Sequence, residues 1–250
     1  MIKLNNIYAG YSDIVLKDIN IEFEKGKIYT IIGTNGSGKS TLLRVLTNFL
    51  SPAKGFVELN GTNIKNYTLN EVSKQISILP QVRNIPDITV ETLISHGRFP
   101  YMGFMRKLTS EDYKHINYAI KTIGINHLRY KNVKDISGGE RQKVFIAMIL
   151  AQNTDIILLD EPTTYLDMKY QIDIMNLVKE LNDNGKTIIM VLHDLNHAIN
   201  YSDKICVLNN GYVIAFEEPE KIVENGIIDN IFKVKTKAIN YENKNYYFFE

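Results

Sequence analysis

The chain has 250 residues, of which 44% are hydrophobic and 23% charged, as in a globular protein that can bury a substantial core. Its formal net charge of +1 argues against binding that depends mainly on a nucleic acid backbone or an anionic lipid surface. The length is large for one domain and small for two, so we expect one domain with an inserted subdomain.

The N-terminus lacks the apolar core of a signal peptide, and no uninterrupted apolar stretch of the sequence is long enough to span a bilayer. We therefore expect the protein to stay in the cytoplasm. The single cysteine, Cys206, excludes an intrachain disulfide. Because it lies in an apolar run, we predict a buried and unreactive thiol.

The first part of the chain, residues 1–32, alternates short apolar runs with turn signals. Residues 19–23 have the period of two that is typical of a half-buried strand. Residues 56–59, followed by Asn60-Gly61, predict a further strand and a hairpin turn. The N-terminal part therefore favours antiparallel β structure.

A glycine-rich stretch at residues 33–41 follows an apolar strand and leads into an apolar helical segment. Its spacing, with Gly-Lys-Ser at the end, fits the phosphate-binding P-loop pattern. The alternative is a strand-to-helix turn that happens to contain glycines, and such a turn would not require Lys-Ser after the last glycine. The predicted nucleotide-binding residues of the loop are Gly33, Asn35, Gly36, Ser37, Gly38, Lys39, Ser40 and Thr41.

The residue types of this loop suit phosphate binding. Gly36 and Gly38 permit unusual backbone angles and remove side chains that would keep the main chain away from the anion. Successive backbone N–H groups then converge on the phosphates at the positive end of a helix. Lys39 would place a charge near the β- and γ-phosphates, and the Ser40 hydroxyl would ligate Mg²⁺.

The middle of the chain is mainly helical in its periodicity. Residues 75–81 predict a strand, and residues 89–94 and 109–123 predict helices. Between these helices, residues 97–104 form an aromatic-rich stretch that we predict to be irregular. A helical insertion over residues 88–152 would account for the excess length.

In the C-terminal part, residues 155–159 and 186–192 predict buried strands, with a helix over residues 170–181 between them. Continuous apolar strands that alternate with helices indicate a parallel sheet covered on both faces. Residues 205–216 predict a strand-turn-strand at the sheet edge, and the tail from Gly226 is too short for a regulatory domain.

These elements predict an α/β fold of the P-loop NTPase class. It would have a mostly parallel central sheet, an N-terminal antiparallel β subdomain and an inserted α-helical subdomain. Within a single domain, we assign residues 1–87 and 153–250 to the nucleotide-binding core and residues 88–152 to the helical subdomain.

Two carboxylates, Asp160 and Glu161, follow the predicted strand at residues 155–159. Ligands of open α/β sheets gather at the carboxyl ends of the strands, so these side chains could face the same crevice as the P-loop. Asp160 would hold Mg²⁺, through water, and Glu161 would orient and deprotonate the attacking water. The alternative is an acidic pair at a solvated strand end, which the P-loop upstream makes less favourable.

Ser137-Gly138-Gly139-Glu140 precedes a helical stretch that runs to Gln152. Ser137 and Glu140 fit the capping box with which many ordinary helices begin. Two consecutive glycines weaken a helix start unless something must approach its backbone closely. A helix N-terminus bared by glycines would be a second phosphate site.

With these motifs together, the chain resembles the ABC-type ATPases, which are the nucleotide-binding subunits of ABC transporters. The resemblance implies that the protein binds and hydrolyses ATP with Mg²⁺. It also implies that two copies pack head to tail, so that Ser137 and Gly139 of one copy, with Gly138 between them, contact the γ-phosphate held by the P-loop of the other. The motifs that carry the resemblance follow the family's order: the P-loop, Gln81, Ser137 to Glu140, Asp160-Glu161, Leu166-Asp167 and His193.

The chain departs from the commonest family pattern at three positions. Ile136 stands for leucine, Glu140 for glutamine and Thr34 for a proline that is often found there. None of these changes removes the serine or the glycines, so we expect function to be retained. Glu140 adds negative charge and should act as the helix cap.

The resemblance assigns roles to four further residues. Gln81 matches the glutamine that senses Mg²⁺ and the attacking water and links to the membrane partner. Asp167 matches the aspartate that crosses the dimer interface, and His193 the histidine that hydrogen-bonds the γ-phosphate. Tyr11 resembles the aromatic residue that stacks on adenine. Ordinary alternatives are a polar residue after a turn for Gln81 and simple packing for Tyr11.

A zinc site is the alternative role for His193. His193 and His197 are four residues apart, which is zinc-binding spacing on a helix, but Asp194 stands where the metalloprotease pattern has glutamate. His193 also follows an apolar strand directly, so we place it at the strand end, before the helix. We favour the phosphate role and interpret His197 as a surface residue.

Three segments resemble the ATPase subunits of iron-chelate importers, the class that also takes in haem and cobalamin. They are residues 97–101, 161–167 and 193–196. The resemblance implies membrane permease subunits, indirect action with a substrate-binding protein, a location on the inner face of the membrane and no nucleic acid partner. The stretch from Arg98 to Phe104 would lie near the docking groove for the permease.

Two other functions remain open. One is the ATPase subunit of another ABC transporter, such as an exporter, against which the form of residues 163–167 argues. The other is a soluble ABC ATPase of DNA repair or translation. Proteins of that class usually carry a long coiled-coil insertion or a second nucleotide domain, and neither is present in this sequence.

Overall fold

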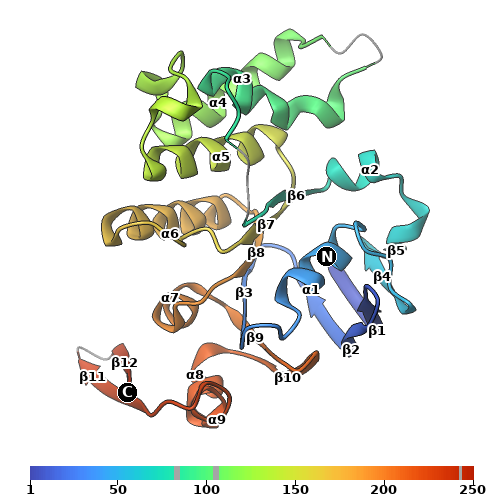
Figure 1. Ribbon diagram of the computed structural model, residues 1–250, viewed down its shortest axis with the longest axis vertical. Helices are drawn as coiled ribbons and strands as arrows, with labels where there is room; N and C mark the ends of the chain where they lie inside the picture. The colour runs from blue at the N-terminus through green and yellow to red at the C-terminus, as the bar shows by residue number, and fades with distance from the viewer. Residues whose placement is uncertain (82–84, 104–106, 242–243) are drawn as a thin grey trace. The chain divides into compact units, whose positions relative to one another are not determined.

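The structure is a computed structural model of the chain, and it describes residues 1–81, 85–103, 107–241 and 244–250. The chain divides into two compact units (Figure 1). The first unit comprises Met1–Asn66 and Ile189–Glu250, and the second comprises Tyr67–Ile188.

An antiparallel sheet forms the start of the first unit. Its strand order is β2-β1-β4-β5, and its strands are β1 (Ile2–Gly10), β2 (Ile14–Phe23), β4 (Lys54–Leu59) and β5 (Thr62–Asn63). In β2, Ile19, Ile21 and Phe23 are buried and alternate with more exposed residues, as a sheet with one core-facing side requires. The predicted antiparallel subdomain is confirmed.

The first unit also contains a second group of paired strands. Strand β3 (Ile28–Gly33), which is buried along its whole length, lies parallel to β9 (Lys204–Asn209), and β10 (Tyr212–Glu217) pairs antiparallel with β9. The turn between β9 and β10 is Asn210-Gly211, with both residues in the left-handed region at φ 49° and 84°. The helices of this unit are α1 (Lys39–Leu46), α7 (Leu195–Tyr201), α8 (Pro219–Glu224) and α9 (Ile227–Phe232), with a 3₁₀ turn at Ile64–Asn66.

The C-terminal tail contains a hairpin that the sequence analysis did not predict. Strands β11 (Thr236–Tyr241) and β12 (Lys244–Phe249) pair antiparallel. The Asp229 carboxylate accepts hydrogen bonds from the backbone and hydroxyl of Thr236 and so ties the hairpin to α9.

The second unit combines a parallel strand pair with most of the helices. Strand β6 (Ile76–Leu79) lies parallel to β7 (Ile156–Asp160), and both strands lie where the sequence predicts strands. Helix α5 packs on α3 and α4, and the three helices lie together in Figure 1. The α-helices of this unit are α2 (Leu69–Ser73), α3 (Val90–Ser95), α4 (Ser110–Ile123), α5 (Gly138–Gln152) and α6 (Met168–Asp183), with 3₁₀ turns at Asn126–Leu128 and Val133–Asp135.

The aromatic stretch at residues 97–104 differs from its prediction. His96–Tyr101 form a 3₁₀ helix, η2, where we predicted irregular chain. The stretch contains Gly97 and Pro100, which disfavour an α-helix, and its conformation depends on packing against α5. Phe104, the last residue of the stretch, lies outside the described residues.

Strand β8 (Thr187–Val191) is fully buried and spans the division between the units. In the second unit the backbone N–H of Thr187 donates to the carbonyl of Asp155, next to β7. In the first unit the N–H of Leu192 donates to the carbonyl of Ile31 in β3. The predicted strand over residues 186–192 is thereby confirmed.

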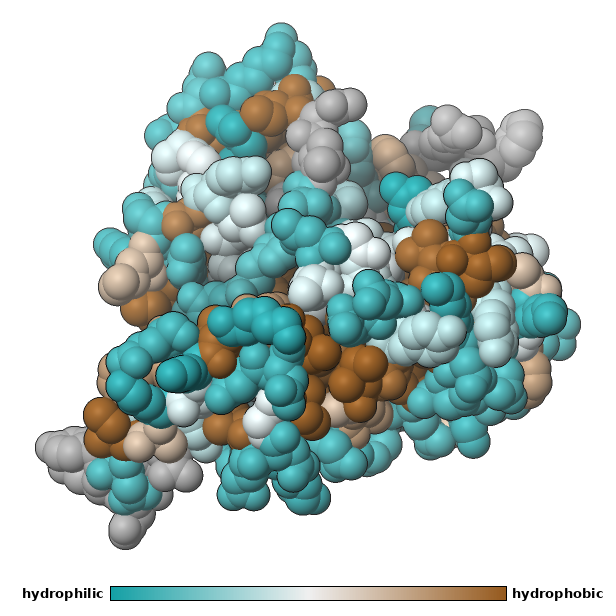
Figure 2. All heavy atoms as spheres, turned by 60° about the horizontal axis from the view of Figure 1, so that its bottom comes forward, coloured by the Kyte–Doolittle hydropathy of each residue, from teal (hydrophilic) through white to brown (hydrophobic). Residues whose placement is uncertain are grey.

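In the described part of the chain, no helix is both long and apolar enough to cross a bilayer. On the face drawn in Figure 2, apolar side chains form patches between polar ones. Apolar atoms make up a large part of ordinary protein surfaces. Tyr165 and Met168 are among the most exposed large apolar side chains, at 98% and 77%.

Candidate nucleotide-binding and hydrolysis site

The P-loop connects β3 to α1 in the first unit, as predicted. Gly38 is the N-cap of α1, in the left-handed region at φ 106°, and no side chain caps the helix there. A side chain at Gly38 would also meet the side chain of Leu16, at 2.7 Å from its Cδ2. The first N–H groups of α1 are therefore not capped by a side chain, and they suit an anion.

Lys39 lies folded over the loop. Its side chain is 7% exposed, and Nζ donates to the carbonyl oxygens of Gly33 at 2.9 Å and Thr34 at 3.0 Å. A buried ammonium needs such oxygen partners, and phosphate oxygens would serve the same need.

The other loop residues divide between buried and exposed positions. Ser37 is 2% exposed, and its Oγ has no hydrogen-bond partner among the described residues. A buried hydroxyl in that state fits an added oxygen ligand. Thr41 is buried, whereas Asn35 and Ser40 are exposed.

Tyr11 lies in the first unit, next to the end of β1. Its ring is 60% exposed, and the guanidinium carbon of Arg44 lies 5.8 Å from the ring centroid. The ring can therefore offer a face to a flat base, with a cation on α1 near it.

His193 is exposed and precedes α7, as predicted. The N-cap of α7 is Asp194, whose Oδ1 accepts the N–H of His197 at 2.9 Å. Because His193 lies outside the helix, the two histidines do not have helical i, i+4 spacing. In the described part of the chain, no group of three or more His, Cys, Asp or Glu side chains is arranged to hold a metal ion.

The interpretation of His197 as a surface residue is wrong in part. The side chain is half-buried, and its ring packs edge-on against Tyr201 with 6.0 Å between centroids. Its position in the first turn of α7 turns it toward that aromatic ring, which the local sequence did not indicate.

In the second unit, Gln81 and Glu161 meet although they are 80 residues apart in the chain. Nε2 of Gln81 donates to Oε2 of Glu161 at 2.5 Å. The Thr164 hydroxyl donates to the same oxygen at 3.1 Å. Glu161 itself has a left-handed backbone, at φ 52°, directly after β7. Two donors therefore fix the carboxylate.

Asp160 is the last residue of β7 and is 8% exposed. A carboxylate at this depth needs positive or hydrogen-bonding partners, and a divalent cation is one such partner. The strand end therefore provides one buried and one half-buried carboxylate in succession, as the sequence predicts.

The predicted capping box opens α5. Ser137 Oγ accepts the N–H of Glu140 at 3.3 Å, and Oε2 of Glu140 accepts the N–H of Ser137 at 2.9 Å. The hydrogen bonds from Ser137 lower the pKa of Glu140. Glu140 thus serves as the cap, as expected from its departure from the family pattern.

Gly139 is buried for a reason that the sequence did not reveal. A Cβ at this position would lie 2.6–2.7 Å from ring atoms of Tyr170, in the first turn of α6. The start of α5 is thus packed against the start of α6. Asp167 is the N-cap of α6, and its Oδ1 accepts the N–H of Tyr170 at 3.0 Å.

Sequence reasoning missed three contributors to the site. Thr164 bonds Glu161, Tyr170 covers Gly139, and Nε2 of Gln142 donates to the carbonyl of Pro162 at 2.5 Å. Gln142 and Pro162 are 20 residues apart. No local pattern signals such a contact, whereas the helix caps were readable because their partners are three residues apart.

A strand, a glycine-rich loop and a helix, with carboxylates at the end of a further parallel strand, define an α/β protein of the P-loop nucleotide-binding class. A family model described as ABC transporter matches residues 16–164. The chain belongs to the ABC transporter family, and it is an ATPase of the ATP-binding cassette type.

Three known proteins illustrate the similarity. The ferric enterobactin transport ATP-binding protein FepC of Escherichia coli is 41% identical over 235 residues, which are 93% of this chain and 86% of FepC. A structure described as an inward-facing ABC transporter of the metal-chelate type has a TM-score of 0.87 at 26% identity and covers 100% of this chain and 96% of its own. The dimeric cassette MJ0796 has a TM-score of 0.77 at 31% identity, covering 88% and 99%.

Proposed function

We propose that this chain is the nucleotide-binding subunit of an importer that takes up an iron–siderophore complex or the related haem or cobalamin. The observation that carries the substrate class is the 41% identity to a ferric enterobactin transport protein over 93% of the chain. The similarity to a transporter of the metal-chelate type supports the same assignment.

We assign ATP binding to the P-loop, with Lys39 on the β- and γ-phosphates and Tyr11 stacked on adenine. The uncapped start of α1 and the buried Ser37 hydroxyl support this assignment. The remaining P-loop ligands would be Gly33, Asn35, Gly36, Gly38, Ser40 and Thr41.

Mg²⁺ would be held by Ser40, Gln81 and Asp160, the last through water. When bound, the ion would neutralise charge on the phosphates. The oxygen-rich residue types fit magnesium, and the near-complete burial of Asp160 supports a role for that carboxylate beyond simple solvation.

Glu161 would act as the base that orients and deprotonates the attacking water. Hydrogen bonds from Gln81 and Thr164 to one carboxylate oxygen hold the group in place at the end of β7. His193, exposed after β8, would hydrogen-bond the γ-phosphate. Catalysis would then be electrostatic and positional.

Each site would be completed by a second copy of the chain, packed head to tail. Ser137, Gly138 and Gly139 would contact the γ-phosphate bound by the partner, and Asp167 would cross the interface. The dimeric MJ0796 cassette supports this arrangement. The exposed apolar side chains of Tyr165 and Met168, on either side of Asp167, also suit coverage by a second copy.

The complex would include membrane permease subunits and act indirectly with a substrate-binding protein, without nucleic acid. The chain would therefore lie on the cytoplasmic side, held at the membrane through the permease. Residues 88–152 would form the helical subdomain that carries the signature serine and glycines, between core segments 1–87 and 153–250.

Uptake by a deletion strain tests this function. The strain is complemented with the wild-type gene or with Glu161→Gln. Uptake is then measured for ⁵⁵Fe-labelled siderophores, for ⁵⁵Fe-labelled haem and for cobalt-labelled cobalamin. Uptake of an iron chelate with the wild type and not with Glu161→Gln supports the proposal. Uptake of haem or cobalamin alone would identify which cargo of the proposed class is carried. If the deletion leaves the uptake of all these compounds unchanged, and the protein is found bound to ribosomes or DNA, a function in import would be contradicted.

A further inference from the structure

A close backbone contact joins the aromatic stretch to the signature helix α5. A Cβ on Gly97 would lie 2.1 Å from the carbonyl oxygen of Met148 and 3.1 Å from the backbone nitrogen of Gln152. Only glycine fits there, because the obstacles are backbone atoms that cannot move aside. The 3₁₀ helix η2 therefore lies directly on the last turn of α5.

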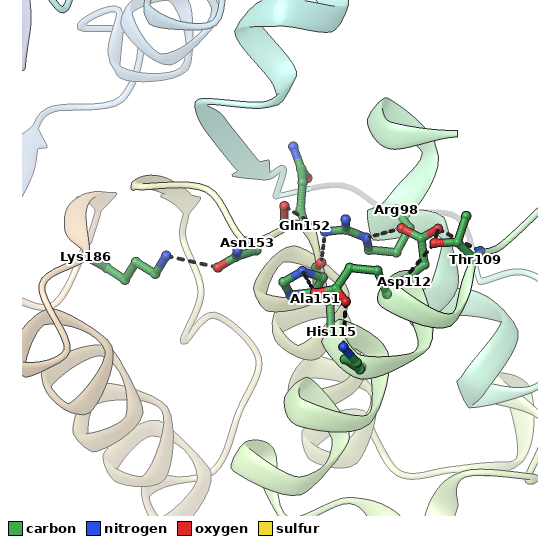
Figure 3. Close-up of polar contacts among 10 residues, drawn as sticks. Arg98, Thr109, Asp112, His115, Ala151, Gln152, Asn153 and Lys186 are labelled. Carbon is green, nitrogen blue, oxygen red and sulfur yellow. Dashed lines mark hydrogen bonds and ion pairs between the residues drawn. The ribbon is translucent and has the colours of Figure 1, made fainter. Parts of the chain in front are cut away.

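Arg98, the next residue, makes this contact polar and specific (Figure 3). Its side chain is 4% exposed, and Nη1 donates to the carbonyl oxygens of Ala151 at 2.9 Å and Gln152 at 3.4 Å. These carbonyls belong to the unsatisfied C-terminal end of α5. A cation at that end also complements the helix dipole.

The same guanidinium binds α4. Nε of Arg98 donates to Oδ1 of Asp112 at 2.8 Å, while Oδ2 of Asp112 accepts the N–H and hydroxyl of Thr109 at 2.9 and 2.7 Å. Asp112 is 4% exposed and sits in the first turn of α4. One arginine thus joins η2, the start of α4 and the end of α5.

The outer side of η2 remains open to partners. Phe99 is 53% exposed and Tyr101 is 36% exposed. The Tyr101 ring stacks on the Arg98 guanidinium, with 3.9 Å from Cζ to the ring centroid. We name Phe99 and Tyr101 the aromatic ledge. The buried guanidinium of Arg98 holds the ledge in place through this contact with the Tyr101 ring.

Helix α5 connects this point with the groups proposed for hydrolysis. Ser137 caps its first turn, and Gln142, a turn further on, holds the carbonyl of Pro162 beside Glu161. At its last residue, Nε2 of Gln152 donates to the carbonyl of Ser73 at 2.5 Å, which ties the helix to the segment before β6. A displacement of the C-terminal end of α5 would therefore be transmitted to Ser137 and the Pro162 carbonyl, and also to the segment before β6.

We propose that Arg98 is a positioning residue that fastens the aromatic ledge to α5, so that force applied to the ledge by a membrane partner reaches Ser137 and the turn that follows Glu161. The inference rests on the proposed function, because it requires a permease that contacts the ledge. Arg98 touches no nucleotide in this scheme and acts through α5.

Stability alone is a poor explanation for this arginine. A buried ion pair contributes little net stability, and apolar side chains of similar volume often do as well or better. A guanidinium on η2 that donates to both α4 and α5 instead provides a fixed geometry, which is what transmission of a displacement needs.

Arg98→Met tests the proposal, together with Arg98→Met/Asp112→Asn, which removes both charges but keeps an oxygen acceptor for Thr109. The matched control is Arg129→Met, which breaks another arginine–carboxylate pair of the second unit, with Glu91. ATP hydrolysis is measured for each isolated chain and for the same chain assembled with its permease in proteoliposomes, after thermal melting has verified folding.

We expect the double variant to retain the basal ATPase of the isolated chain while its stimulation by the permease falls about 2- to 30-fold. Arg129→Met should keep the wild-type ratio of stimulated to basal rate. Equal loss of basal and stimulated rates, or unchanged stimulation, would overturn the inference. If the double variant does not fold, Arg98→Lys is judged by the same ratio. Absence of ATPase in the wild type would instead contradict the proposed function itself.

Discussion

At Gly139 two physical requirements coincide. The sequence explains the glycine by close approach of a phosphate to a bared helix start, and the structure adds the ring of Tyr170, which occupies the space of a Cβ. The two explanations make different predictions for a double variant, so they can be separated.

We expect Gly139→Ala to lower the melting temperature by about 2 to 10 °C, because overpacking against a ring typically costs about 1–3 kcal/mol. Adding Tyr170→Ala should restore the melting temperature, which scanning calorimetry measures. ATP hydrolysis should stay low in the double variant if close approach of a phosphate also requires the glycine. Full recovery of hydrolysis would show that Tyr170 is the sole reason for the glycine. Tyr170→Ala alone is the control.

Cys206 lies in β9 and is fully buried, and burial raises its pKa to about 12. Since the usual pKa of the thiol is near 9, the thiolate fraction at pH 8 falls about 1,000-fold. Labelling with a chromogenic disulfide reagent should therefore proceed only after unfolding in guanidinium. Rapid labelling of the folded protein would contradict the buried assignment of β9.

At this scale the sequence analysis succeeded where the partners are neighbours in the chain. The Ser137–Glu140 capping box is confirmed, as is the burial of Cys206. It missed Gln142 and Tyr170, because their roles depend on tertiary packing that no local pattern encodes.

At the scale of elements, strong periodicity predicted the strands and the long helices, and their caps fixed the starts. The 3₁₀ helix η2 was missed since its shape comes from the contact of Gly97 with α5. The C-terminal hairpin was missed too. It has only two strands, so it depends on its attachment to α9 through Asp229.

The start of α4 predicts an acid-sensitive contribution to stability. Burial acts to raise the pKa of Asp112, but hydrogen bonds from Thr109 and the Arg98 cation outweigh it, and the pKa lies below the ordinary 3.8. Because the folded state has the lower pKa, this contribution is fully present above pH 3.8 and is lost as the pH falls below that value.

We expect Asp112→Asn to be less stable than the wild type at pH 7 and to lose less free energy of unfolding between pH 5 and pH 2. Urea titrations across that range measure the difference. Asp183→Asn, which changes an exposed carboxylate at the end of α6, should leave the profile of the wild type. Parallel profiles for Asp112→Asn and the wild type would contradict the role of the buried pair.

At the scale of the whole molecule, the chain's fold class and family were predictable because nucleotide chemistry imposes residue types at fixed spacings. The P-loop and the strand-end carboxylates are examples. These residues do not identify the transported substrate, since no residue of this chain is proposed to touch it. The proposed completion of each site by a second copy is supported by the exposed start of α5, where Ser137 and Gly138 are open to solvent.

The mass of Glu161→Gln in solution with Mg-ATP tests the central claim most directly. This variant should bind ATP without hydrolysing it, so that light scattering after gel filtration gives twice the mass of one chain. Glu161→Gln/Lys39→Ala, which loses the phosphate contact, should remain at the mass of one chain under the same conditions. A Glu161→Gln protein that holds ATP and still elutes only as a monomer would contradict a site shared between two copies.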